Sequence, residues 1–187
     1  MKKLIIKTCI LTLIIILAVG FLLFGVVSVT SPSIMASTTF KLNLKTACVN
    51  YSVKQYEKTG SINDLALLVE RADWANDYSS TAKYAPLLLS DTSFYNFVEN
   101  EKDGGYEKYV ACLYVESLYK TENIEKFIEV AFAYYTGESG SNTVRIAIVT
   151  AKDDSETLNA ILKKLKAIEN KTEETIYLIE QINNLIK

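Results

Sequence analysis

Residues 56–65 read YEKTGSINDL, and this short stretch decides the expected fold. Gly60 can adopt the positive φ with which many helices end. Ile62 and Leu65 follow it at the spacing of a new apolar helix face. The stretch therefore predicts a helix end, a tight turn and the start of a second helix.

A second copy of this turn lies 62 residues further on, where residues 118–127 read LYKTENIEKF. Weaker copies occupy residues 43–47, 76–81 and 152–158, so a new helix is expected every 16 to 18 residues. Such self-similarity is typical of repeat architectures and indicates internal duplication, with a two-helix unit of about 34 residues. Besides the shared Lys-Thr pair, the aligned residues are Val53 with Val115, Ile62 with Ile124, and Leu65 with Phe127.

The N-terminal segment is long and apolar enough to cross a membrane. Residues 8–29 form a run of 22 uncharged residues. A helix rising ~1.5 Å per residue needs about 20 such residues to span a hydrocarbon core. Three lysines precede this run among the first seven residues, and the next charge after it is Lys41.

This lysine asymmetry predicts the topology. By the positive-inside rule, residues 1–30 are a cytoplasmic N-terminus plus a signal-anchor helix, and residues 31–187 form a domain outside the cytoplasm. The alternative is a signal peptide cleaved after Ala36, which would leave Ser37 as the mature N-terminus. Signal peptides usually have an apolar region of only ~7–15 residues. The sequence therefore favours an uncleaved, single-pass anchor in the cell membrane.

Composition favours an all-α body. The chain is 49% hydrophobic and contains only two prolines and seven glycines, which suits packed helices joined by short turns better than a many-turned β-sandwich. With the N-terminal lysines set aside, the body is mildly acidic and its lysines are dispersed. This charge pattern does not indicate a nucleic-acid-binding surface.

Histidine and cysteine usage excludes several kinds of site. The chain has no histidine, which removes the commonest general base and a common metal ligand. Cys48 and Cys112 belong to no paired ligand motif, which excludes a structural zinc site. They are either small buried thiols or a disulfide formed outside the cytoplasm. We therefore expect no enzyme and no cofactor, and assign no catalytic, cofactor-binding or metal-binding residue.

Helix boundaries follow from capping signals. Ser31, Asp91 and Asp154 precede expected helices and can accept hydrogen bonds from first-turn amides, whereas Gly60 and Gly137 can end helices. Helices are expected at residues 32–42, 45–58, 63–75, 79–89, 92–100, 106–120, 124–135, 142–151, 155–168 and 173–186.

Apolar periodicity is clear at the C-terminus and ambiguous before it. Residues 142–151 alternate partly like a strand through Val144, Ile146 and Ile148, so a short strand is the alternative there. The last two helices should pack on each other through residues spaced three and four apart. These are Leu158, Ile161, Leu162, Leu165, Ile168, Leu178, Ile179, Ile182 and Leu185.

Three groups of residues could form a functional site. Residues 99–105 resemble a calcium loop, but Val110 stands where the bidentate glutamate belongs, so a solvated loop is expected. An aromatic set around it could line a groove for a peptide or glycan, or form part of the core: Phe94, Tyr95, Phe97, Tyr106, Tyr109, Tyr114 and Tyr119. Five carboxylates beside lysines are expected to form solvent-facing ion pairs: Glu125, Glu129, Glu169, Glu173 and Glu174.

The period and the turn chemistry resemble the tetratricopeptide-like helical repeats. The match is best over residues 49–72, with Tyr56 at the late aromatic position of the first helix, Gly60 at the turn and Ala72 at the late small position. Leu65 stands where that family has a small residue. The resemblance implies an α-solenoid-like array of short antiparallel hairpins and carries no catalytic residues. One membrane helix followed by about nine short helices also resembles single-pass membrane proteins of low-GC bacteria.

The sequence thus predicts a membrane-anchored, extracytoplasmic helical-repeat protein that acts by binding or scaffolding, with another protein as its partner. Two alternatives stay open. One is a secreted helical protein released by cleavage near Ala36. The other is a small subunit of a membrane complex that acts through its transmembrane helix, where Ala18, Gly20 and Gly25 offer close-approach surfaces.

Overall fold

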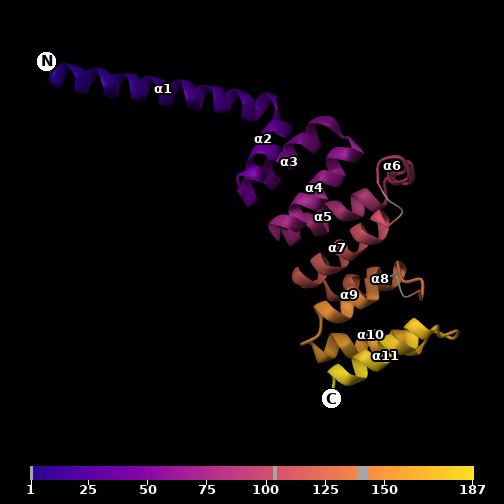
Figure 1. Cartoon of the computed structure of the whole chain (residues 1–187). Helices are drawn as coiled ribbons and strands as arrows, with labels where there is room; N and C mark the ends of the chain where they lie inside the picture. Colours follow the sequence, from indigo (N-terminus) through magenta and orange to yellow (C-terminus); the bar gives the residue numbers. More distant parts are fainter. Residues whose placement is uncertain (1, 103–104, 139–142) are drawn as a thin grey trace. The chain divides into compact units, whose positions relative to one another are not determined.

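The computed structural model describes residues 2–102, 105–138 and 143–187, and every regular element in these residues is an α-helix (Figure 1). The chain divides into two compact units, Met1–Gly60 and Ser61–Lys187. The all-helical prediction is confirmed.

Helix α1 (Lys2–Thr30) is the apolar N-terminal helix. Its segment Ile10–Thr30 has a mean hydropathy of 3.1, and none of it is buried inside the protein. In length and composition it is able to cross a membrane, which confirms the predicted apolar helix itself.

Helix α2 (Pro32–Lys41) packs against α3 (Lys45–Thr59) within the first unit. Proline is suited to the first turn of α2 because the amide it lacks would have no partner there. The buried residues between the two helices are Met35, Ala36, Thr39, Cys48, Val49 and Ser52. This face fixes α2 on α3.

The link between α1 and α2 is a single residue, Ser31. Its predicted role as a side-chain cap is wrong, because its side chain makes no cap hydrogen bond. Since α1 continues to Thr30, the Ser31 amide still donates to the Val27 carbonyl, and the Ser31 carbonyl accepts from the Ile34 and Met35 amides of α2. The capping side chain comes instead from α3, where Gln55 Oε1 accepts from the Ser33 amide at 3.1 Å.

In the second unit, neighbouring helices pack in pairs to form the helical array, and these pairs include α8 on α9. Helix α4 packs on α5, α5 on α7, α7 on α8, and α7 also on α9. Their bounds are α4 Ile62–Ala75, α5 Tyr78–Leu89, α7 Tyr106–Lys120, α8 Ile124–Ala133 and α9 Thr143–Thr150.

Helix α7 is the centre of this array, and Val110, Ala111 and Val115 on it are fully buried. Helix α6 (Phe94–Glu101) contacts α4 and does not separate α5 from α7. The packing order therefore departs from the chain order at α6, where the predicted succession of hairpins is interrupted.

Four of the five predicted turns share one backbone geometry. Asn43, Gly60, Asn76 and Glu122 have φ between 55° and 62°, and each lies two residues before the next helix begins. In three of them a Schellman hydrogen bond of 2.8–2.9 Å closes the preceding helix. These bonds run from Leu44 N to Thr39 O, from Asp77 N to Ala72 O and from Asn123 N to Leu118 O.

The fifth turn, residues 152–158, is built differently. Its residues are all described, and none has a positive φ. Asp154 instead starts the next helix, as predicted, because its carboxylate accepts from the Thr157 amide at 3.0 Å and the Thr157 hydroxyl at 2.6 Å. These two hydrogen bonds lower the pKa of Asp154.

Helices α10 (Ser155–Lys166) and α11 (Glu173–Leu185) pack on each other as expected. Ile161, Leu165 and Ile182 are fully buried, but Leu185 is 47% exposed, so the predicted face ends before it.

The region that alternated like a strand is helix α9. Its buried residues Val144, Ala147 and Ile148 lie at three- and four-residue spacing, whereas Val149 is exposed. The helical period therefore prevails over the partial alternation.

Candidate functional site

The start of helix α6 lies beside a cleft. Asp91 accepts a hydrogen bond from the Ser93 amide at 2.8 Å and another from the Ser93 hydroxyl, and these bonds lower the pKa of Asp91. Thr92 and Ser93 consequently form a turn, and α6 begins at Phe94. The predicted capping role of Asp91 is wrong, because its carboxylate bonds to Ser93 before the helix and no side chain caps α6, which starts two residues later than predicted.

Most of the predicted aromatic set belongs to the core. Phe94, Phe97 and Tyr106 are each 5–6% exposed, with ring centroids 5.9–6.4 Å apart. Tyr114 is buried, and Tyr119 packs its ring 5.2 Å from that of Phe127. The core alternative therefore describes these rings. Only Tyr95 and Tyr109, which are 75% and 45% exposed, offer aromatic surface from this set.

A polar cluster connects α4 with the end of α6 and the start of α7. Glu70 Oε1 accepts hydrogen bonds from Lys102 Nζ at 3.0 Å and from the Tyr106 hydroxyl at 2.9 Å. Lys102 Nζ also lies 4.5 Å from the centroid of the Tyr106 ring. Burial and the Glu70 carboxylate raise the pKa of Tyr106 far above its usual range. The phenol therefore stays protonated and serves as a hydrogen-bond donor.

This cluster changes the interpretation of the acidic loop. Lys102, inside the predicted loop, is paired with Glu70, and Val110 is fully buried in α7. Asp103 and Gly104 lie outside the described residues. Among the residues described, no group of three or more Cys, Asp or Glu side chains is placed to hold a metal ion.

The cleft beside α6 has a volume of about 580 Å³, within the range of ~300–1,000 Å³ typical of ligand sites. Carboxylates dominate its charged lining, and Tyr95 supplies its exposed aromatic surface. The lining residues are Leu89, Asp91, Thr92, Phe94, Tyr95, Val98, Glu99, Lys102 and Glu107.

Negative charge continues on the neighbouring helices. Asp73 of α4 is partly buried, and this burial, together with the nearby Glu116 of α7, raises the pKa of Asp73. Burial and the charge of Asp73 likewise raise the pKa of Tyr109. The surface of α4 and α7 thus carries carboxylates that repel one another and would be stabilised by a cationic partner.

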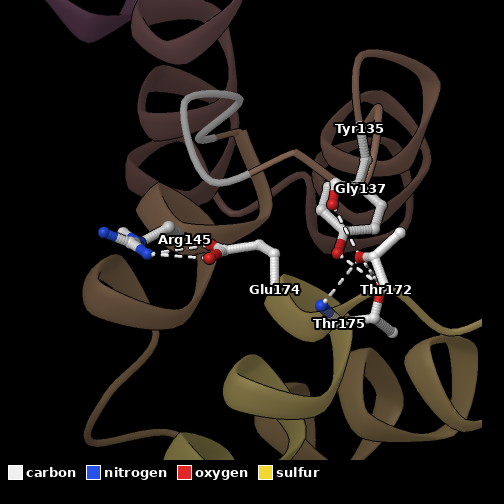
Figure 2. A network of polar contacts seen from close by, with 6 residues as sticks. All are labelled: Tyr135, Gly137, Arg145, Thr172, Glu174 and Thr175. Carbon is white, nitrogen blue, oxygen red and sulfur yellow. Dashed lines mark hydrogen bonds and ion pairs between the residues drawn. The ribbon is translucent and has the colours of Figure 1, made fainter.

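One of the five predicted surface carboxylates is buried, which corrects that prediction. Glu174 is 8% exposed, and both its oxygens accept from Arg145 Nη2, at 2.8 Å and 3.1 Å (Figure 2). A charge can be buried here because its partner is supplied by another helix, α9. The other four carboxylates, Glu125, Glu129, Glu169 and Glu173, are exposed.

The Arg145 side of this pair is incompletely satisfied. Its Nε is buried and has no hydrogen-bond partner among the described residues. Its guanidinium carbon lies 5.4 Å from the Tyr177 ring centroid. The pair joins α9 to α11.

A second network in Figure 2 joins the loop after α8 to the start of α11. The Thr172 hydroxyl donates to the Gly137 carbonyl at 2.6 Å and caps α11 by accepting from the Thr175 amide at 3.2 Å. The Tyr135 and Thr175 hydroxyls are 2.8 Å apart.

Gly137 has the predicted positive φ, 76°, but it does not end a helix, because α8 already ends at Ala133. A Cβ at this position would lie 3.2 Å from Thr172 Cγ2. Glycine is therefore needed here both for backbone conformation and for close approach.

The two body cysteines differ in environment. Cys48 is fully buried under α2, where its thiol lies 3.5 Å from the Ala36 carbonyl. Cys112 is partly buried, which raises its pKa. Neither forms a disulfide among the described residues, and a raised pKa leaves less of the reactive thiolate.

Comparison of the chain with family models, with curated proteins and with solved structures finds no match. Sequence reasoning missed the Arg145–Glu174 pair and the Glu70–Lys102 pair. The only sequence signal for the first was a lone arginine within the apolar run of α9.

Proposed function

We propose that this chain is a single-pass membrane protein, with its N-terminus in the cytoplasm, whose helical body acts outside the cytoplasm by binding or scaffolding another protein. The observation that carries the proposal is α1, whose segment Ile10–Thr30 is apolar, 21 residues long and not buried inside the protein. A soluble core helix of this hydropathy would be covered by the rest of the protein. The lysines before it set the direction of insertion.

The environment of Ala36 supports an uncleaved anchor. Ala36 is fully buried within α2, and its carbonyl lies 3.5 Å from the Cys48 thiol. Cleavage after Ala36 would remove the first half of α2, including the buried Met35, and uncover Cys48 and Val49 on α3. The first unit is complete only if the N-terminal segment is retained.

The cleft beside α6 is the proposed binding site of the body. Tyr95 is 75% exposed at its edge, and three of the four charged residues that line it are carboxylates. The fourth, Lys102, is already paired with Glu70. This chemistry suits a protein segment that carries basic and apolar side chains.

We also infer that the second unit is a solenoid-like array of the tetratricopeptide-like kind. Support comes from the consecutive packing of α4, α5, α7 and α8 and from the recurring left-handed turn. Such arrays act as protein-binding scaffolds.

Topology is tested with Glu169→Cys, an exposed position in the second unit. A membrane-impermeant thiol reagent should label this variant in intact cells, over the background of the parent chain. Labelling that requires lysis would place the body in the cytoplasm. A mature N-terminus at Ser37 would establish the secreted alternative.

Binding is tested with a photo-crosslinking amino acid in place of Tyr95, and a matched probe in place of Glu173, which is exposed elsewhere in the same unit. In native membranes, the Tyr95 probe should give a discrete product that the Glu173 probe does not give. Equal products from both probes would show that the cleft has no special role.

A further inference from the structure

A small cavity lies where α1 meets α2 and α3, all within the unit Met1–Gly60. Its volume is about 270 Å³, which is below the range of typical drug-sized ligand pockets. If α1 spans the membrane as proposed, the end of α1 places this cavity at the level of the lipid headgroups. The lining residues are Ser28, Val29, Pro32, Lys54, Glu57 and Lys58.

Two lysines of this cavity are held in place by their neighbours. Lys58 Nζ donates to the Thr30 carbonyl at 2.8 Å, at the C-terminal end of α1. An ammonium group has three donors, so two remain for a ligand. Lys54 Nζ lies 5.2 Å from the centroid of the Tyr51 ring. Because the lysines are four residues apart on α3, they share one face of that helix.

The remaining lining decides which anion fits. Glu57 also faces the cavity, so two cationic groups are opposed by one carboxylate. The net positive charge favours an anion over a zwitterion, while the carboxylate disfavours a doubly charged free phosphate. A carboxylate also accepts hydrogen bonds from hydroxyl groups. Val29 and Pro32 add apolar surface beside these groups.

We propose that this junction cavity binds the phosphodiester of an anionic, hydroxyl-bearing glycerophospholipid, with the Lys54 and Lys58 ammonium groups on the phosphate and Glu57 on a headgroup hydroxyl. The inference rests on the proposed function, because only a membrane-inserted α1 brings the cavity to the headgroups. The site adds a specific lipid contact at the C-terminal end of the apolar anchor.

The test uses the full chain in detergent and native mass spectrometry with added phosphatidylglycerol or phosphatidylcholine. The protein should retain phosphatidylglycerol in preference to phosphatidylcholine. The double substitution Lys54→Gln with Lys58→Gln should lower the retained phosphatidylglycerol about tenfold, because it removes two charge-assisted contacts. Equal retention of the two lipids, or unchanged retention in the double variant, would overturn the proposal.

Two further variants distinguish binding at this cavity from non-specific attraction to lysines and from loss of the folded structure. Lys54→Arg with Lys58→Arg keeps both charges and should keep the lipid. Lys163→Gln with Lys166→Gln removes two exposed lysines of α10 in the other unit and should also leave retention unchanged. Loss of lipid in the α10 variant equal to that in the α3 variant would show only non-specific attraction. Circular dichroism confirms that each variant keeps its helix content.

The source of the phosphate is tested by adding inorganic phosphate to the lipid-bound protein. The lipid should remain bound. Displacement by millimolar phosphate would assign the cavity to a free anion and contradict the lipid proposal. Failure of the anchor itself is detected separately, by the thiol labelling at position 169.

Discussion

The turns at residues 60 and 122 have the same backbone conformation but different residues at the decisive position. Gly60 has a φ of 62° and Glu122 a φ of 60°. The left-handed conformation is easy for glycine and disfavours a residue with a Cβ by roughly 1–2 kcal/mol. At residue 122 the turn is therefore held by the packing of α7 on α8 without a glycine, whereas at residue 60 glycine adopts this conformation at little cost.

The threonine of the shared Lys-Thr pair makes the same kind of hydrogen bond in both turns. The Thr59 hydroxyl donates to the Gln55 carbonyl at 3.1 Å, and the Thr121 hydroxyl donates to the Ser117 carbonyl at 2.8 Å. In each copy the threonine hydroxyl adds a hydrogen bond to a carbonyl near the end of the helix, and the Ser117 carbonyl also accepts from the Thr121 amide at 3.0 Å.

The largest expected effect concerns the aligned residues Leu65 and Phe127, which are 2% and 0% exposed. Phe127→Ala should lower the free energy of unfolding by ~3–5 kcal/mol and Leu65→Ala by ~2–5 kcal/mol. Urea unfolding of the full chain in detergent, followed by circular dichroism, measures both. Glu129→Ala, an exposed neighbour on α8, should stay within about 0.5 kcal/mol. A Phe127 variant no less stable than this control would contradict the packing of α8.

Next in size is Gly60→Val, which should destabilise the chain by roughly 1–2 kcal/mol. No atom lies within 4 Å of an added Cβ, so the loss reports backbone strain alone. Gly60→Asn should cost less, because Asn43 and Asn76 hold the same conformation in the sister turns. Thermal melting ranks the two variants, and an asparagine variant as unstable as the valine variant would refute the shared turn geometry.

The converse change, Glu122→Gly, should stabilise the chain by about 0.5–1 kcal/mol, because the strain removed exceeds the added flexibility of the unfolded chain. Glu125→Gly, an exposed position in the first turn of α8, should destabilise it by about 0.5–1 kcal/mol. Substitution by glycine should therefore change the stability in opposite directions at two positions that are three residues apart. The melting temperatures of the two variants test this prediction. A lower melting temperature in both would mean that Glu122 is not strained.

The smallest effect is expected from the threonines. Thr121→Val and Thr59→Val keep the side-chain shape and should each cost about 0.5–1 kcal/mol, with the shorter Thr121 hydrogen bond at the upper end. Differential scanning calorimetry resolves such differences. If one substitution lowers the stability and the other does not, the threonine hydrogen bond stabilises only one of the two turns.

Local signals explain why the helices could be predicted. The bounds of α7, Tyr106 and Lys120, were predicted correctly because an apolar period lies between a glycine pair and the Lys-Thr turn. At α6 the prediction began two residues early, because Asp91 uses its carboxylate to form a turn through Ser93 before the helix starts. Capping residues therefore locate a helix boundary to within a few residues, and the turn before the helix decides at which residue the helix begins.

The polar pairs could not be predicted because their partners are distant in sequence. Glu70 and Lys102 are 32 residues apart, Arg145 and Glu174 are 29 apart, and Lys58 reaches Thr30 across 28 residues. Each pair forms only when separate helices pack. Helical periodicity places Glu174 beside exposed carboxylates, and nothing local shows that α9 brings an arginine to it.

The junction of α1 and α2 has a mechanical consequence. A one-residue linker between two helices would ordinarily act as a hinge. Here Lys58 holds the last carbonyl of α1 and Gln55 holds an early amide of α2, so α3 bridges the linker from the side. A force that pulls α1 away from α2 therefore acts on the main chain at Ser31 and on these two side-chain hydrogen bonds. The link between α1 and α2 should resist bending for this reason.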